Sequence, residues 1–327
     1  MSAMRWATIA VFAFLVSGAA AEAPRSWTSE WPKTDFSLTS VGFKEIFSGG
    51  PPKDGIPSID EPKFTDAATA GAALPPTEPV MSVALNGQAR AYPLRILIWH
   101  EIVNDTIGDT PIAVTYCPLC NSGVVFERTV EGTVTTFGTT GKLRNSDLVM
   151  YDRATESWWQ QYQGLAIVGE RLGTELTRLP ARLESVADFV SRHPDGKVLV
   201  PVREDLRDYG RNPYAGYDSA AAPFLYSGTY GGPGRPLMRV VAVGDAAWSL
   251  DTVRKNGTIE SGDIVIRWTP GQASALDTAL IAKGRDVGTV VVQRRAADGT
   301  LADIPYDVPF AFAFQAFHPD APIVHEP

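Results

Sequence analysis

Two cysteines stand close together in the stretch TYCPLCNSG, as Cys117 and Cys120, and the 327-residue chain has no others. Two thiols with two residues between them can close a small disulfide, exchange electrons as a dithiol, or bind a soft metal ion as thiolates. A disulfide of this spacing would stabilise the fold little, because so small a ring removes little chain entropy from the unfolded state. The spacing alone leaves all three uses open.

A metal site needs ligands beyond the two thiolates, because zinc takes four ligands in structural sites. His100 lies in the segment YPLRILIWHEIVN, whose apolar spacing predicts a helix. That helix could bring the imidazole to the cysteines by packing over the end of the strand before Cys117. Thiolates and imidazole together favour Cu(I) or Zn²⁺. We therefore expect a metal site made of His100, Cys117 and Cys120, which Asp147 or Met150 could complete.

Thiol–disulfide exchange is the main alternative to metal binding. In thioredoxin-like proteins the first cysteine begins a helix, whose dipole lowers the thiol pKa. Here NSGVVFERTV follows Cys120 and predicts a turn and a strand, so a thioredoxin fold is not expected, whereas a dithiol on a turn stays open. A third alternative is a non-catalytic scaffold, either with a structural disulfide or with Trp158 and Trp159 facing a carbohydrate. No catalytic residue is assigned, and enzymatic activity is left open.

The first residues, MSAMRWATIAVFAFLVSGAAA, combine an early arginine, an apolar run and small residues before position 22. This pattern is typical of a secretory signal peptide, which we place at residues 1–21. We therefore expect a periplasmic or secreted protein, in a compartment where thiol pairs tend to oxidise. The apolar run is too short to span a bilayer, and no later run is longer, so no transmembrane segment is expected after cleavage.

The charge of the chain bears on its partners. It has 29 Lys and Arg against 37 Asp and Glu, a formal net charge of −8, and no run of basic residues. An acidic surface repels phosphate backbones, so nucleic acid is excluded as a partner. The expected partner is a small ligand or another exported protein.

Strand-like stretches outnumber helical ones, and 29 Gly and 25 Pro predict many turns. VALNGQARAYPL resembles the later VAVGDAAWSL, and TPIAVTYCPLCNSG resembles GDIVIRWTPGQASA. We therefore expect a β-rich α+β fold with two degenerate tandem repeats of a strand/helix/strand module, the second abbreviated. The expected segments are residues 1–21 (signal peptide), 22–80 (N-terminal extension), 81–200 (first repeat, with the His/Cys site), 201–238 (linker) and 239–327 (shortened second repeat).

The second stretch serves as an internal comparison for the first. Thr269 and Gln272 stand there in place of Cys117 and Cys120, and the proline between them is kept. If the module folds twice, it can fold without the cysteines. Their presence is then easier to explain by chemistry than by folding.

The runs PLRILIWHEIVND, TPIAVTYCPLCNSG, KLRNSDLVMYD and SWWQQ resemble a large prokaryotic family of exported proteins, a domain of unknown function, over approximately residues 49–318. The resemblance implies no particular activity. The family's signature maps onto His100, Glu101, Asn104, Cys117, Pro118, Cys120, Asn145, Asp147, Tyr151, Asp152, Trp158 and Trp159. Beside the cysteines we expect a pocket formed by Glu101, Asn104, Asn145, Asp147, Met150, Tyr151, Asp152, Trp158 and Trp159.

Overall fold

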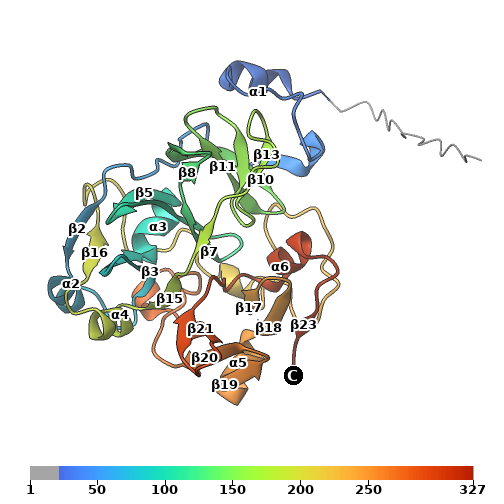
Figure 1. The fold of residues 1–327 in the computed structure, drawn as a ribbon. Helices are drawn as coiled ribbons and strands as arrows, with labels where there is room; N and C mark the ends of the chain where they lie inside the picture. The colour runs from blue at the N-terminus through green and yellow to red at the C-terminus, as the bar shows by residue number, and fades with distance from the viewer. Residues whose placement is uncertain (1–21, 327) are drawn as a thin grey trace, which may run out of the picture.

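The computed structural model describes residues 22–326, so the predicted signal peptide, residues 1–21, lies outside the described part. Within residues 22–326 no helix is both long enough and apolar enough to cross a membrane. Most of these residues belong to short strands and to the turns between them (Figure 1).

Five small sheets of three to five strands form a five-bladed β-propeller. Its helices are short, with six or seven residues each: α1 (Arg25–Glu30), α2 (Ala67–Ala73), α3 (Leu94–His100), α4 (Val186–Arg192), α5 (Leu250–Asn256) and α6 (Ala311–Phe317). The expected α+β fold of two strand/helix/strand repeats is therefore wrong. A helix of two turns has too little apolar surface to cover a sheet, so the sheets bury their faces mainly against one another and against loops.

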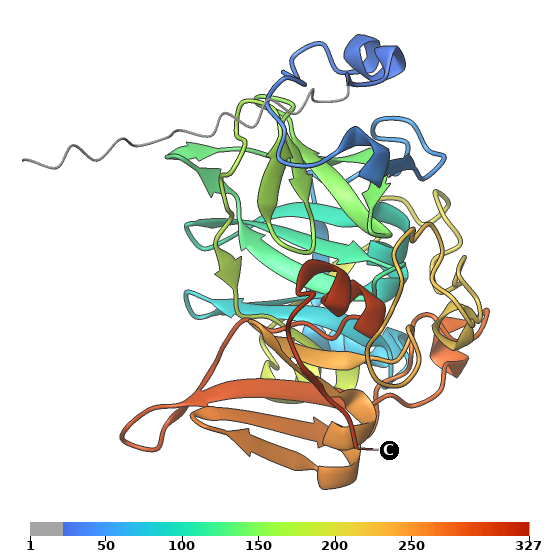
Figure 2. The same cartoon turned by 90° about the vertical axis from the view of Figure 1, so that its right-hand side faces the viewer.

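The functional region involves two of the sheets. Sheet I has the order β1-β10-β11-β12-β13, with bounds Ile46–Ser48, Phe137–Arg144, Asp147–Asp152, Trp158–Gln160 and Leu165–Val168. Sheet II has the order β14-β7-β6-β5, with bounds Arg178–Leu179, Ser122–Glu127, Thr110–Cys117 and Ile102–Ile107. Figure 2 shows sheet I at the top of the molecule and sheet II directly below it.

The other three sheets complete the fold. Sheet III has the order β15-β3-β4-β16-β2, with bounds Arg182–Ser185, Pro79–Leu85, Gln88–Pro93, Lys197–Val200 and Lys63–Asp66. Sheet IV has the order β17-β18-β23, with bounds Val240–Val243, Ala246–Ser249 and Ile323–Val324. Sheet V has the order β19-β20-β21-β22, with bounds Thr258–Ser261, Ile264–Thr269, Thr289–Arg295 and Leu301–Asp303. A small hairpin joins β8 (Thr129–Val130) to β9 (Thr133–Val134).

Antiparallel pairing prevails in these sheets, and the parallel pairs are β4 with β16 and β18 with β23. The two stretches that resemble each other in sequence run through β3, β4, α3, β5 and β6 and through β17, β18, α5, β19 and β20. Each stretch therefore contributes strands to two different sheets, III and II in the first case and IV and V in the second. Their similarity follows successive sheets of the propeller and does not delimit two α+β modules.

The largest hydrophobic cluster draws residues from every sheet and includes both cysteines. A second cluster lies under the N-terminal segment and contains Trp31 and Trp158. The Trp158 ring centroid is 5.1 Å from that of Trp27 and 5.4 Å from that of Trp31. Trp159 is equally buried and donates its indole N–H to Asp152 Oδ2 at 3.0 Å. Neither indole therefore faces solvent, where a carbohydrate could stack on it.

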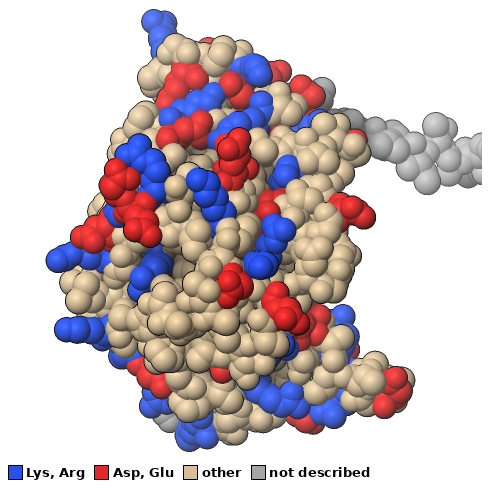
Figure 3. All heavy atoms as spheres, turned by 90° about the vertical axis from the view of Figure 1, so that its left-hand side faces the viewer, with Lys and Arg blue, Asp and Glu red and all other residues tan. Residues whose placement is uncertain are grey.

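Basic and acidic side chains are interspersed over the face shown in Figure 3. The net charge of −8 is therefore not gathered into a single acidic patch on that face. Mixed charge of this kind serves solubility and gives no strong local field.

Candidate metal centre

The CPLC segment forms the tight turn between strands β6 and β7. Cys117 pairs with Ser122 at the last rung of this hairpin, and Asn121 has φ 50° and donates its N–H to Pro118 O at 3.2 Å. Asparagine tolerates this left-handed backbone conformation, which turns the chain sharply back. Both cysteines are buried free thiols, with 1% of Cys117 and 0% of Cys120 exposed.

A second tight turn, between β10 and β11, faces the cysteines from sheet I. Its two central residues, Asn145 and Ser146, have φ of 53° and 65°, which is the backbone of a type I′ hairpin turn. This turn aims two carbonyls at the sulfurs: Ser146 O lies 3.7 Å from Cys117 Sγ, and Asn145 O lies 4.0 Å from Cys120 Sγ. Asp147 follows as the first residue of β11.

The two turns bring together two sulfurs and one carboxylate. Ligand atoms of Cys117, Cys120 and Asp147 all lie within 4.8 Å of one another, and all three residues are buried. Within residues 22–326 this is the one group of three such side chains that could hold a metal ion. Zn–S bonds of about 2.3 Å place neighbouring ligands under 4 Å apart, so a shared tetrahedral ion would draw ligand atoms at the 4.8 Å limit closer together.

The carboxyl of Asp147 is held firmly on one side only. Its Oδ2 accepts hydrogen bonds from Gln160 Nε2 at 2.6 Å and from the Tyr162 N–H at 2.9 Å. Its Oδ1 is buried and has no hydrogen-bond partner. An unpartnered buried acceptor is costly in an apolar interior. The free oxygen therefore marks a position for a proton or a cation.

Burial governs the electrostatics of this group. It raises the pKa of the Cys117 thiol, and the nearby Asp147 and Glu101 carboxylates raise it further. The pKa of Cys120 is raised well above its ordinary value for the same leading reason. Burial also raises the pKa of Asp147 to about 7. Without a cation, the raised pKa values favour the protonated, neutral forms of these three side chains. A bound divalent ion would favour their deprotonated, negatively charged forms.

Glu101 stands beside the cluster as a fourth titratable group. It ends helix α3 with φ 59° and is buried, and burial together with the Asp147 charge raises its pKa to about 8. Among the described residues its carboxyl forms no hydrogen bond or ion pair. It lines a cavity of about 120 Å³, whose other walls include Leu119 from the cysteine turn and Leu148 from β11.

His100 does not join the sulfurs, contrary to the expectation from sequence. Its Nδ1 hydrogen-bonds with Pro57 O at 2.7 Å, and its Nε2 hydrogen-bonds with Tyr209 OH at 2.8 Å. The ring also stacks on Tyr209, with centroids 5.8 Å apart. Both ring nitrogens thus form hydrogen bonds that join α3 to two loops. The third residue beside the two cysteines is Asp147, where a histidine was expected.

Three other residues expected in the pocket hold the surrounding structure instead. Asn104 clamps β10, since its Nδ2 donates to Phe137 O and its Oδ1 accepts from the Phe137 N–H. Met150 lies in the main core, and Asp152 accepts hydrogen bonds from Thr155 and Trp159. These side chains support sheet I and do not reach the cysteines.

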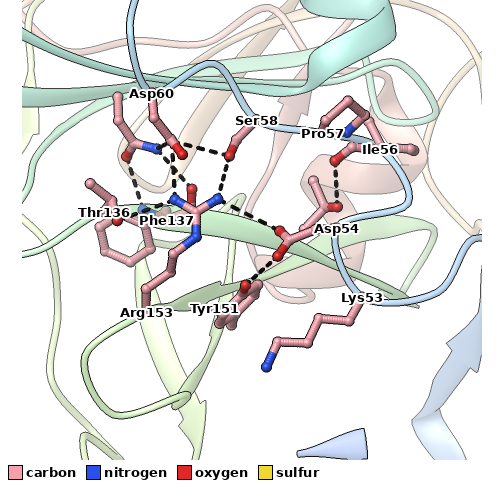
Figure 4. Close-up of polar contacts among 12 residues, drawn as sticks. Lys53, Asp54, Ile56, Pro57, Ser58, Asp60, Thr136, Phe137, Tyr151 and Arg153 are labelled. Carbon is pink, nitrogen blue, oxygen red and sulfur yellow. Dashed lines mark hydrogen bonds and ion pairs between the residues drawn. The ribbon is translucent and has the colours of Figure 1, made fainter.

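The loop of residues 49–60 closes one wall of the cavity, and a polar network holds it in place (Figure 4). Arg153 contacts Asp60 at 3.0 Å, Ser58 at 2.8 Å and Asp54 at 3.7 Å, and Tyr151 OH donates to Asp54 Oδ2 at 2.5 Å. No sequence pattern predicts these pairs. Contacts between residues so far apart in the chain have no local signature.

A second loop, residues 217–225, covers the cysteine turn from the other side. Tyr217 OH donates to Leu119 O at 3.1 Å and accepts the Phe224 N–H at 3.1 Å. Ser146 Oγ donates to Phe224 O, which ties the loop to the β10–β11 turn. The segment expected to be a linker, residues 201–238, therefore includes a cover for the site.

Fold and site together define a β-propeller with a buried cluster of two thiols and one carboxyl group between two of its sheets. The sequence model of a family described as "Protein of unknown function (DUF3179)" matches residues 53–321. The chain belongs to this family, as its resemblance to a domain of unknown function predicted. No curated protein and no solved structure matches the chain.

Proposed function

We propose that this protein binds one zinc ion through Cys117, Cys120 and Asp147. The observation that carries the proposal is the buried, unpartnered Oδ1 of Asp147 in a group whose ligand atoms lie within 4.8 Å of one another. A cation in this position satisfies the free oxygen and offsets the mutual repulsion of two thiolates and a carboxylate. The hydrogen bonds to Oδ2 hold the carboxyl in the required orientation.

The ligand set favours zinc over copper. Cu(I) prefers soft sulfur and nitrogen donors, whereas Zn²⁺ accepts thiolate and carboxylate together. With imidazole absent from the cluster, the third donor is a hard oxygen. We therefore narrow the pair of metals expected from sequence to zinc.

Three protein ligands leave one tetrahedral position free, as in catalytic zinc sites. We propose that a water molecule fills this position from the cavity of about 120 Å³ beside Glu101. A cavity of that size accommodates a few waters or one very small molecule. We further propose that the protein is exported by its N-terminal segment and acquires the ion outside the cytoplasm.

The test is metal analysis with matched variants. Protein purified under anaerobic conditions and incubated with Zn²⁺ should retain about one equivalent after gel filtration. Cys117→Ser should abolish retention. Asp147→Asn should lower the affinity by at least about tenfold, because an amide keeps the shape but loses the charge. His100→Asn is the control and should bind zinc normally.

Cobalt substitution adds an optical readout for the sulfur ligands. The Co²⁺ protein should show a sulfur-to-cobalt charge-transfer band that disappears in Cys117→Ser and persists in His100→Asn. Retention below about a tenth of an equivalent in the parent protein, or equal loss in the Asp147 and His100 variants, refutes the proposal.

Thiol exchange is the second candidate, because the two sulfurs lie within 4.8 Å of each other. Their burial and raised pKa values weigh against it, since exchange requires an accessible thiolate. A metal-free protein with a reversible two-electron potential, lost in Cys120→Ser, would favour this candidate over zinc.

A further inference from the structure

A cavity between sheets IV and V is lined by four arginines and has no part in the cysteine site. Its volume is about 330 Å³, and its walls come from helix α5, the residues before β17 and residues 285–287. The guanidinium-bearing residues are Arg235, Arg239, Arg254 and Arg285. Such a grouping suits planar, multidentate recognition of oxyanions.

Arg239 is the buried member of this group, with only 6% of its surface exposed. Its Nη2 donates to Ser274 Oγ at 2.7 Å and lies 3.6 Å from Asp218 Oδ2. Its Nε is buried and has no hydrogen-bond partner. Burial disfavours the charged form and lowers the pKa of this guanidinium, although the Asp218 charge opposes the shift. Its neighbours therefore satisfy this buried guanidinium only in part.

Asp218 cannot by itself neutralise its neighbours. It is fully buried and lies 2.8 Å from Arg285 Nη1 as well as 3.6 Å from Arg239. One buried carboxylate is therefore divided between two guanidiniums. Asp277 also contacts Arg285, at 3.2 Å, so Arg285 has two carboxylate partners. Among the described residues, the one carboxylate near Arg239 is that of Asp218, at 3.6 Å.

The two arginines at the rim have unused donors. Arg235 and Arg254 are exposed, and within residues 22–326 their side chains form no hydrogen bond or ion pair. Asp286, another wall residue, already accepts the N–H groups of Gly271, Gln272 and Gly288. This leaves Asp251 as the one carboxylate of the cavity wall without a bonded donor.

We propose that this cavity binds a compact, multiply charged oxyanion, such as a phosphate group or a small polycarboxylate. Arg235 and Arg254 bind it through their free guanidinium donors, and the buried Arg239 adds positive charge to the cavity wall. Asp251 faces the same space and opposes binding. The site is independent of the zinc site, so either one can fail without the other.

Calorimetric titration of the full mature chain tests the proposal, with inorganic phosphate in one arm and citrate in the other, at constant ionic strength. Saturable binding is expected in at least one arm. Arg254→Gln should weaken it by about tenfold, the value of one charge-assisted hydrogen-bond pair. Asp251→Asn should strengthen it by roughly threefold, because it removes the opposing charge.

The matched control is Arg294→Gln, which removes the same charge from an exposed arginine paired with Asp263 in sheet V. It should change the affinity by less than about twofold, since Arg294 does not line the cavity and its exposed charge is screened by salt. The proposal is overturned by the absence of saturable binding in both arms, by equal effects of the Arg254 and Arg294 variants, or by weaker binding in Asp251→Asn.

Discussion

Glu101 should make the metal-free protein less stable as the pH rises, and Glu101→Gln should remove this effect. The folded chain holds the pKa of Glu101 at about 8 against an ordinary value of 4.5, chiefly through burial. A carboxyl whose pKa is raised by folding stabilises the fold in its protonated form. That contribution is complete below pH 4.5 and is lost as the pH rises through 8.

The magnitude follows from the size of this shift. At 1.36 kcal/mol per pKa unit, a rise from 4.5 to about 8 corresponds to about 5 kcal/mol between acid and alkaline pH. Asp147 and Asp307, with pKa values raised by burial to about 7 and about 6, contribute in the same direction. The difference between the parent protein and Glu101→Gln reports the Glu101 contribution together with its coupling to Asp147, whose charge raises the Glu101 pKa.

Urea unfolding of the metal-free protein at intervals from pH 4.5 to 9 provides the measurement. Glu101→Gln should become progressively more stable relative to the parent protein across this range. Glu170→Gln, which alters an exposed carboxyl, is the matched control and should follow the parent curve. A stability difference between parent and Glu101→Gln that varies by less than about 1 kcal/mol over the range refutes the assignment of a buried, unpartnered carboxyl.

Other predictions concern stability and the metal. Gly141→Ala should cost about 2–4 kcal/mol in urea unfolding, because φ is +69° and a Cβ would lie 1.9 Å from Pro51 O. Trp158→Ala should cost about 3–5 kcal/mol, since its indole fills the N-terminal aromatic cluster, and unchanged stability would contradict that packing. Ser185→Ala should cost about 1 kcal/mol by removing the cap of α4, where Ser185 Oγ accepts the Asp188 N–H. Zinc removal by a chelator should lower the melting temperature of the parent protein and leave that of Cys117→Ser unchanged.

The sequence was informative about the site where the chemistry is local. The CPLC turn, the strand after it and the candidacy of Asp147 all follow from short stretches of residues. The prediction for His100 was wrong about the direction in which its side chain points. Helix α3 ends at Glu101, which has a positive φ, and the imidazole of His100 points to Pro57 and Tyr209. Nothing in the spacing of residues along a helix specifies which loop will lie beside its last turn.

The fold was harder to predict, because it depends on pairing between distant strands. The sequence indicated many short strands, and the structure has them, but the parallel pairing of β4 with β16 joins residues about a hundred positions apart. The sequence predicted a helix as part of each strand/helix/strand module, whereas each helix of the structure is a connector of about two turns. The two similar stretches do form corresponding strands and helices. The inference that each stretch is a separate folding module was wrong.

The loop of residues 217–225 has a consequence for the kinetics of the site. Tyr217 and Ser146 fasten it across the cysteine turn by hydrogen bonds, and the sulfurs beneath are buried. An ion at the cysteines can enter or leave only when this cover opens, so its exchange rate is set by local unfolding and not by affinity. Zinc should therefore exchange slowly with a chelator at neutral pH. Ser146→Ala should speed that exchange while leaving the equilibrium affinity nearly unchanged.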